Sequence, residues 1–171
     1  MDKTMLYKYP VAYAKEHGEL DIYRASLRAN IACKEAIEAI IRESFDGMHL
    51  KGDAASKALS AYGTERVNYI LANTVRQKDW DGRFSRENKA WAKTVPVHED
   101  TDAWGDDRRR SFVVESHPAV LDGFINQVRR IQPEQMKKPS VRKQLAALRA
   151  GSDAFSALMD GKSIKPRGEE R

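Results

Sequence analysis

A long amphipathic run between residues 19 and 45 constrains the fold of this chain more than any other feature. Its apolar side chains recur at steps of three and four residues, the spacing that places them along one face of an α-helix. The stripe consists of Leu20, Tyr23, Leu27, Ile31, Ile37, Ile41 and Phe45, with Lys34 as its polar member and Ala36 and Ile40 widening it. A helix this long needs other elements to cover its apolar face, so the pattern predicts a helical core.

Shorter patterns predict further helices over residues 10–17, 53–62, 85–93 and 116–131, and one that starts at residue 64 and has an apolar face up to Val75. The predicted N-caps are Asp53, Thr64, Ser85 and Ser116. Between residues 97 and 110 the periodicity stops, which predicts an exposed loop, and residues 111–115 are expected to form a short strand or extended piece. The predicted fold is one compact, mostly α domain of about six helices with minor extended structure.

The composition changes after residue 131. Residues 132–171 hold nine basic and five acidic side chains, a net charge of +4, whereas the whole chain has a net charge of +5. We therefore expect a helical core domain over residues 1–131 and a flexible, basic, partly helical tail over 132–171, with short helices at 140–150 and 152–160. A basic balance permits nucleic acid or acidic proteins as partners without requiring them.

Several classes of protein are disfavoured by the composition. Cys33 is the only cysteine among 171 residues, so an internal disulfide or a cysteine-rich zinc site is not expected. No run approaches the roughly 18 consecutive apolar residues of a membrane span, and the first residues do not have the pattern of a signal peptide. We expect a protein of the bacterial or host cytoplasm that does not associate with membranes.

The segment from Asp79 to Ser85 reads DWDGRFS and is the chemically richest part of the chain. One interpretation is a docking surface with Trp80 and Phe84 as anchors and Arg83 as a charged contact. The other is a structural lock, in which Trp80 and Phe84 are buried, Asp81 pairs with Arg83 or caps a helix, and Gly82 provides a turn with positive φ. In that case the polar ends of Asp81 and Arg83 are the groups expected to stay exposed.

Polar residues near the apolar faces have two interpretations. Asn30, Lys34 and Asn73 either fix the register of the helices through satisfied hydrogen bonds or line a polar pocket. Among the acidic residues of the 97–110 segment, His98, Glu99, Asp100 and Asp102 could group around a divalent ion. Their spacing does not match a calcium-binding loop, and a solvated charged loop is the alternative.

Catalytic motifs are not found. Cys33 lies in the middle of a helix, where a cysteine is usually a small packed hydrophobe, and there is no nucleophile elbow, Walker loop or dinucleotide fingerprint. The residues His17, His49, His98 and His117 are scattered. The sequence therefore predicts a protein that is not an enzyme and requires neither a cofactor nor a metal.

Binding of nucleic acid is a separate hypothesis, carried by basic side chains near the end of the chain. The residues that could neutralise phosphates are Arg108, Arg109, Arg110, Lys137, Lys138, Arg142, Lys143 and Arg149. The alternative is a solvated tail and an arginine run that pairs with the carboxylates preceding it, which are Glu99, Asp100, Asp102, Asp106 and Asp107.

Four segments carry a family resemblance. They read YRASLRANIACKEAI at 23–37, YGTERVNYILANT at 62–74, WDGRFS at 80–85 and NxxWA at 88–92. Over roughly residues 6–130 the chain resembles a family of uncharacterised domains carried by conjugative elements, plasmids and phages of Gram-positive gut bacteria. The piece KPSVxxQL at 138–145 is similar to the ends of other proteins from such elements. No catalytic residues come with this resemblance.

The resemblance implies a setting in which small proteins inhibit host defence systems. The leading hypothesis is a non-enzymatic, anti-CRISPR type of inhibitor that binds a bacterial immune nuclease, most plausibly a Cas9-type effector, through the Trp80–Phe84 loop. A DNA- or RNA-binding accessory protein or autoregulator of a mobile element is the alternative. A metal-dependent nuclease that uses the carboxylates between Glu99 and Asp107 is a third possibility.

Overall fold

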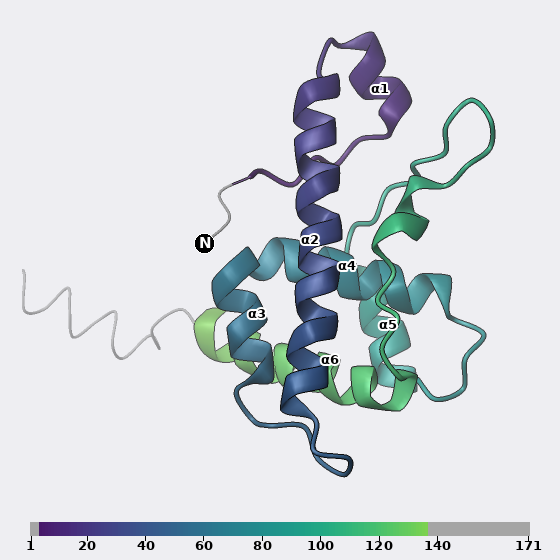
Figure 1. Cartoon of the computed structure of the whole chain (residues 1–171). Coiled ribbons are helices and arrows are strands. Elements are labelled where there is room, and N and C mark those ends of the chain that lie inside the picture. Colours follow the sequence, from purple (N-terminus) through teal and green to yellow (C-terminus); the bar gives the residue numbers. More distant parts are fainter. Residues whose placement is uncertain (1–3, 137–171) are drawn as a thin grey trace, which may run out of the picture. The chain divides into compact units, whose positions relative to one another are not determined.

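The computed structural model describes residues 4–136, and the regular secondary structure of this part is helical (Figure 1). Residues 1–132 group as one compact unit, which is the subject of the description below, and residues 133–171 group as a second unit. The elements are α1 (Val11–Glu16), α2 (Leu20–Ser44), α3 (Ala54–Tyr62), α4 (Thr64–Gln77), α5 (Arg86–Thr94), the 3-10 helix η1 (Arg108–Phe112) and α6 (Pro118–Met136). The predicted mostly α fold is confirmed, and the predicted tail helices lie outside the described residues.

The long amphipathic run forms α2, whose inward face contributes Cys33, Ile37 and Ile41 to the core. The helix ends at Phe45, and the carboxylate of Asp46 accepts hydrogen bonds from the backbone N–H groups of Met48 and His49 at 2.8 and 2.7 Å. The loop that follows returns the chain to α3. As predicted, Cys33 is a packed core residue, with no exposed surface.

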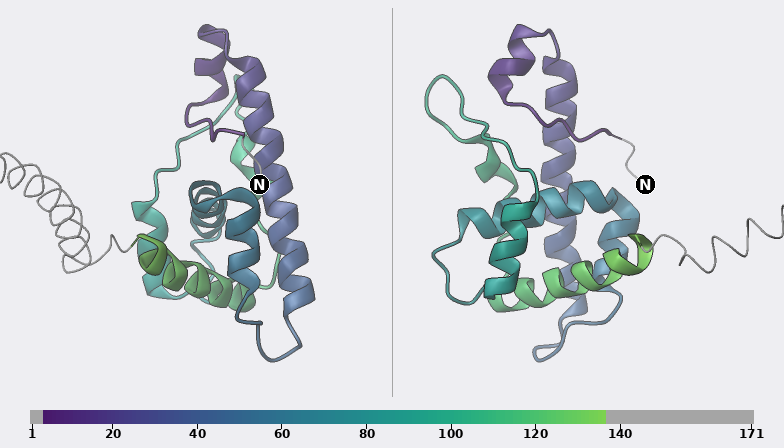
Figure 2. Two further views of the ribbon diagram at one scale, coloured as in Figure 1. Left: turned by 90° about the vertical axis from the view of Figure 1, so that its left-hand side faces the viewer. Right: turned by 180° about the vertical axis from the view of Figure 1, so that it is seen from behind.

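Helix α4 is the most deeply buried helix of this unit, because nine of its fourteen residues are buried. Helices α2, α3, α5 and η1 all pack against it. Figure 2 shows α4 nearly end-on in its left view, beside α2 and α3 and above α6. Its apolar side chains share one core with those of α6, including Val67, Ile70, Leu121, Phe124 and Ile125.

Polar side chains of α4 also attach the irregular segments of the chain. The guanidinium of Arg76 donates to four carbonyl oxygens at and beyond the end of α5, those of Ala92, Lys93, Val95 and Val97, over 2.8–3.4 Å. The hydroxyl of Thr74 accepts from the N–H of Val114 at 3.0 Å, and Lys78 donates to the carbonyl of Val114 at 3.2 Å. Segments without regular structure thus find their backbone partners on one helix.

The polar residues near the apolar faces make hydrogen bonds or ion pairs with neighbours, although the side-chain oxygen of Asn73 is buried without a partner. The buried Arg66 donates to the side-chain oxygen of Asn30 and to the carbonyls of Ser26 and Thr4, at 3.1 and 2.8 Å for the two carbonyls. Its guanidinium therefore joins α4, α2 and the N-terminal segment.

The other two polar positions have partners as well. The amide of Asn73 donates to the carbonyl of Arg109 at 2.9 Å, and Lys34 pairs with Glu38 at 3.1 Å. These contacts fix how α4 meets η1 and hold the Lys34 amine on its own helix, in place of the polar pocket that was the alternative.

Three predicted helix caps, Asp53, Thr64 and Ser116, are wrong. The side chain of Asp53 makes no cap hydrogen bond and instead pairs with Lys57 at 3.4 Å, one turn along α3. At the start of α6, the ring nitrogen Nδ1 of His117 accepts from the N–H of Ala119 at 3.2 Å, a role that the sequence assigned to Ser116. Thr64 is the first residue of α4, which Gly63 precedes with a φ of +83°.

The prediction for residues 97–115 also needs correction. The loop is not simply exposed, because Asp100 is buried and Arg108–Phe112 form the short helix η1. The expected strand at 111–115 is absent from the described structure, and only Val113 onward continues as extended chain. The isolated bridges Phe45–Leu50 and Thr101–Asp107 are the extended pairings that the described residues contain.

Replacing Arg66 with Met should lower the free energy of unfolding by about 3 kcal/mol, because three acceptors lose a buried charged donor. Chemical denaturation measures the change. The matched control is Arg28→Met on the exposed side of α2, which should shift stability by about 0.5 kcal/mol or less. Equal losses for the two variants would contradict the role assigned to Arg66.

Candidate functional site

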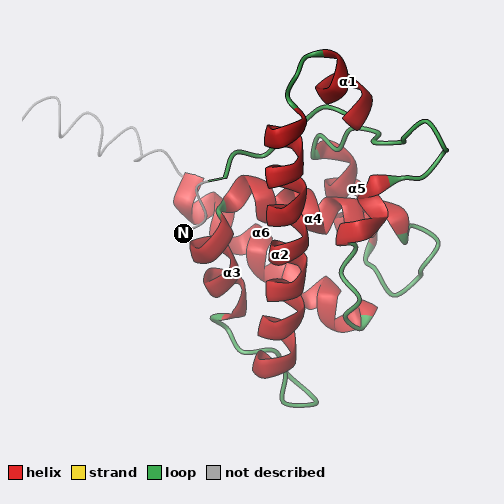
Figure 3. Cartoon of the chain, turned by 45° about the horizontal axis from the view of Figure 1, so that its top comes forward, coloured by secondary structure: helices red, strands yellow, loops and turns green. Residues whose placement is uncertain are grey.

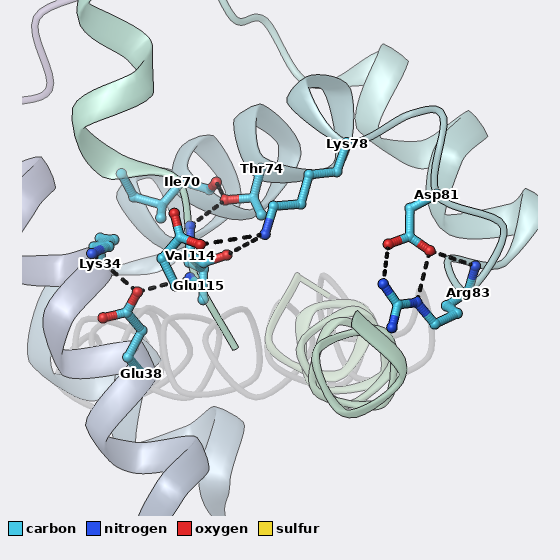
Figure 4. Close-up of polar contacts among 9 residues, drawn as sticks. All are labelled: Lys34, Glu38, Ile70, Thr74, Lys78, Asp81, Arg83, Val114 and Glu115. Carbon is cyan, nitrogen blue, oxygen red and sulfur yellow. Dashed lines mark hydrogen bonds and ion pairs between the residues drawn. The ribbon is translucent and has the colours of Figure 1, made fainter. Parts of the chain in front are cut away.

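The loop between α4 and α5 is held rigid by one carboxylate. Asp81 is buried and accepts three hydrogen bonds from Arg83: Oδ1 from the backbone N–H at 2.9 Å and from Nε at 3.0 Å, and Oδ2 from Nη2 at 2.8 Å (Figure 4). These bonds hold the pKa of the Asp81 carboxyl down, at about 2 against a usual 3.8, with the Arg83 side chain as the largest cause. The guanidinium of Arg83 remains about half exposed beside this pair.

The second half of the loop is fastened to the core. Phe84 is 3% exposed and belongs to the hydrophobic core. Ser85 caps α5 by accepting from the N–H of Asn88 at 3.3 Å, as predicted, and its own N–H donates to Asp122 of α6 at 2.9 Å. The amide of Asn88 also donates to Asp122, at 2.7 Å. The loop therefore has one fixed conformation relative to α5 and α6.

Trp80 lies on the outside of this loop and is 79% exposed. The structural interpretation placed both aromatics inside and the polar ends of Asp81 and Arg83 outside, and it is wrong for Trp80 and Asp81. The docking interpretation is in turn wrong for Phe84, whose buried ring cannot reach a partner. Gly82 does not have the predicted positive φ. The buried carboxylate of Asp81 meets the donors of Arg83, while the indole before it lies outside.

A second exposed tryptophan, Trp104, was not selected from the sequence. It is 93% exposed and lies in a hairpin that the Thr101–Asp107 bridge closes. The carboxylate of Asp102 accepts from the N–H groups of Trp104 and Asp106, both at 2.9 Å, and Gly105 makes the turn with a φ of +80°. The sequence signal that could have identified Trp104 is a tryptophan among turn-forming and acidic residues, with no apolar partner at helical spacing.

The base of this hairpin is anchored to the helices. Asp100 accepts from the hydroxyl of Tyr23 at 2.5 Å and from the N–H of Val11 at 2.9 Å. Together with burial, this bond raises the pKa of Tyr23 above its ordinary range. Because the buried carboxylate has donors from α2 and from the start of α1, the hairpin cannot move freely against them.

The two tryptophan loops project on the same side of the described unit. Figures 1 and 3 both place the loop between α4 and α5 and the hairpin before η1 on the right-hand side of the molecule. We call Trp80, Arg83 and Trp104 with their two loops the tryptophan edge. Both indoles stand beside an aspartate that accepts the backbone N–H two residues further on, so both are presented by a rigid turn.

The arginine run is largely neutralised by its own neighbourhood. Arg108 pairs with Asp102 at 3.1 Å, and Arg109 pairs with Asp107 at 2.7 Å. These pairs agree with the alternative in which the run meets the carboxylates preceding it. Arg110 is exposed. Of the other predicted phosphate-binding residues, Lys137, Lys138, Arg142, Lys143 and Arg149 lie outside the described residues.

Metal binding finds no geometric support in the part of the chain that the structure describes. Within residues 4–136, no three His, Cys, Asp or Glu side chains lie close enough to hold an ion together. In the acidic segment, Asp100, Asp102 and Asp107 are instead acceptors for the hydrogen bonds that shape the hairpin. Their oxygens serve the structure of the loop.

A cavity of about 710 Å³ lies between α2 and the start of α6. Ile41, Phe45 and Val120 form part of its wall. Two acidic residues also line it and are already engaged: Glu38 accepts from Lys34 and from the N–H of Glu115, and Glu115 lies 3.9 Å from Lys78 (Figure 4). The cavity therefore combines an apolar wall with polar residues, which include Arg42, Ser116 and His117.

In the described residues, regular secondary structure is helical, and two loops on one side each carry an exposed tryptophan. The chain belongs to the family described as "Protein of unknown function (DUF3849)", whose model matches residues 6–133. No curated protein and no solved structure matches it. No helix of the described residues is long and apolar enough to cross a membrane.

The two aromatics of the first loop should respond differently to truncation. Phe84→Ala should lower the free energy of unfolding by about 3–5 kcal/mol, because it leaves a cavity in the core. Trp80→Ala should change it by about 0.5 kcal/mol or less, because the indole is exposed. Denaturant unfolding followed by circular dichroism compares the two, and a large loss for Trp80→Ala would contradict the exposed position.

The Asp81–Arg83 pair predicts a pH dependence of stability. Because the pKa of Asp81 is lower in the folded chain, its contribution is complete above the unfolded pKa of about 4 and is lost as the pH falls through about 2. Asp81→Asn should therefore be less stable than wild type at neutral pH, and the difference should close at about pH 2. Urea midpoints over a pH series measure it, and a difference that persists below that pH would overturn the assignment.

Proposed function

We propose that this chain is a non-enzymatic binding protein that docks onto another protein through the tryptophan edge. The supporting observation is the exposure of Trp80 and Trp104 on two rigid loops of one side. Indoles are enriched among the residues that dominate binding energy, and an anchor that is already fixed loses little entropy on binding. Single exposed apolar residues are common on proteins, but two largely exposed indoles on loops of one side favour an interface.

The partner class we propose is a bacterial defence nuclease, with a Cas9-type effector first. This part of the proposal is supported by the resemblance to domains of mobile elements, whose small proteins often act against host immunity. The expected mode of inhibition is steric: the tryptophan edge occupies a face of the effector and blocks its action on nucleic acid. In this role the protein needs a stable surface and no catalytic residues.

A nucleic-acid-binding accessory protein is the second candidate. The exposed Arg110 and the net charge of +4 over residues 132–171 favour it, whereas the ion pairs of Arg108 and Arg109 weaken it. An electrophoretic shift with DNA and RNA over a range of salt concentrations tests this candidate, because phosphate binding is strongest at low salt. Adding magnesium or manganese to the same samples of protein and nucleic acid tests the hypothesis of a metal-dependent nuclease.

Removing either indole should weaken docking onto the partner without disrupting the fold. With a purified Cas9-type effector and its guide RNA, Trp80→Ala and Trp104→Ala should each weaken binding by about 30-fold and restore cleavage of target DNA. Biolayer interferometry and a cleavage assay measure both effects. Met48→Ala is the matched control, because Met48 is equally exposed (81%) in the loop between α2 and α3.

The proposal for this partner fails if the wild-type chain neither binds such effectors nor protects target DNA. The role of the edge fails if the tryptophan variants bind as well as Met48→Ala does.

A further inference from the structure

The hairpin that carries Trp104 is acidic, although the chain as a whole is basic. Residues 99–107 contain Glu99, Asp100, Asp102, Asp106 and Asp107 and no basic side chain, against a net charge of +5 for the whole chain. A loop with this charge repels phosphates and anionic lipid headgroups at close range and attracts cationic groups.

The carboxylates of the hairpin divide into engaged and available groups. Asp100 is buried, Asp102 pairs with Arg108, and Asp107 pairs with Arg109. Glu99 and Asp106 are exposed. The side chain of Asp106 is not needed for the turn, because the residue contributes its backbone N–H and carbonyl groups to it. Its carboxylate, two residues from the indole of Trp104, is therefore available to a partner.

The indole of Trp104 is open to solvent on a turn whose backbone is held by hydrogen bonds. At 93% exposure its ring can receive a flat cationic group, and Trp is the aromatic side chain that binds cations best. Arginine suits the site better than lysine, because a guanidinium stacks on the ring and presents its edge to a carboxylate. An exposed indole and an exposed carboxylate two residues apart in one tight turn can thus together receive a side chain of this kind.

We infer that Trp104 and Asp106 together receive an arginine from a basic protein surface. The inference rests on the proposed docking function and specifies the chemistry of the partner. The arginine stacks on the indole of Trp104 and pairs with the carboxylate of Asp106, and neighbouring basic groups face Glu99.

Trp80 differs from Trp104 in its electrostatic surroundings. Arg83 neutralises Asp81, and the amine of Lys89 donates to the carbonyl of Asp79 at 2.8 Å. The loop of Trp80 also holds one exposed carboxylate, that of Asp79, but the basic side chains of Arg83 and Lys89 lie in or beside this loop, whereas residues 99–107 hold none. Trp80 is therefore the apolar anchor of the edge, and Trp104 selects for positive charge.

Selection from a random dodecapeptide display library tests this chemistry without knowledge of the natural partner. The bait is the immobilised full chain, and counter-selection uses the Trp104→Ala variant. Enriched peptides should contain arginine next to apolar residues, and synthetic copies should bind Trp104→Ala at least about 10-fold more weakly than wild type. Enrichment of acidic peptides, or no enrichment over the Trp104→Ala variant, would overturn the inference.

Charge variants separate pairing with Asp106 from general attraction. Asp106→Asn should weaken binding of the selected peptides by about 3–10-fold at low salt, and the difference should largely vanish at about 0.5 M salt. Glu43→Gln removes the same charge from the last turn of α2, at the far end of that helix from the hairpin, and should leave affinity unchanged. Equal losses for both variants would contradict a specific role for Asp106.

These results can be told apart from failure of the proposed nuclease partner. If the binding of basic peptides depends on Trp104 and Asp106 while the chain binds none of the effectors tried, the inference is supported and the nuclease partner is refuted. An effector that binds wild type and Asp106→Asn equally, at all salt concentrations, would support the nuclease and refute the inference.

Discussion

The burial of α4 is the constraint on which the rest of the described unit depends. A helix enclosed by its neighbours has no solvent to satisfy its polar groups, so each one needs a protein partner. The chain uses this requirement to hold its irregular parts. Arg66 binds the N-terminal segment, Arg76 binds the chain after α5, and Thr74 and Lys78 bind the strand-like stretch before α6. Three side chains of α4, with Lys78 directly after it, therefore replace the ladder of hydrogen bonds that a sheet would provide.

The helices could be predicted from the sequence because their signals are local. Apolar spacing and the breaks at Gly63 and Pro96 depend on residues a few positions apart. Positions that depend on distant partners could not be predicted. The burial of Asp100 follows from Tyr23 and Val11, which are 77 and 89 residues away, and no pattern near Asp100 indicates them.

The candidate site shows the same limit. The DWDGRFS loop was identified correctly as a distinctive feature, but local chemistry does not say which of its two aromatics faces the core. That choice depends on the bond from Ser85 to Asp122, on a helix that starts more than thirty residues later. Trp104 was not predicted as a site residue, because the acidic residues around it indicated a solvated loop. The same acidic residues are what hold the indole in place.

The hairpin also has a consequence for how relatives of this chain can diverge. The bonds that shape its tip run among residues 101–108, and only its base reaches the helices. The residues of the tip can therefore change in identity or number while the base and the core keep their packing. The chemistry of this surface can thus change without refolding the protein.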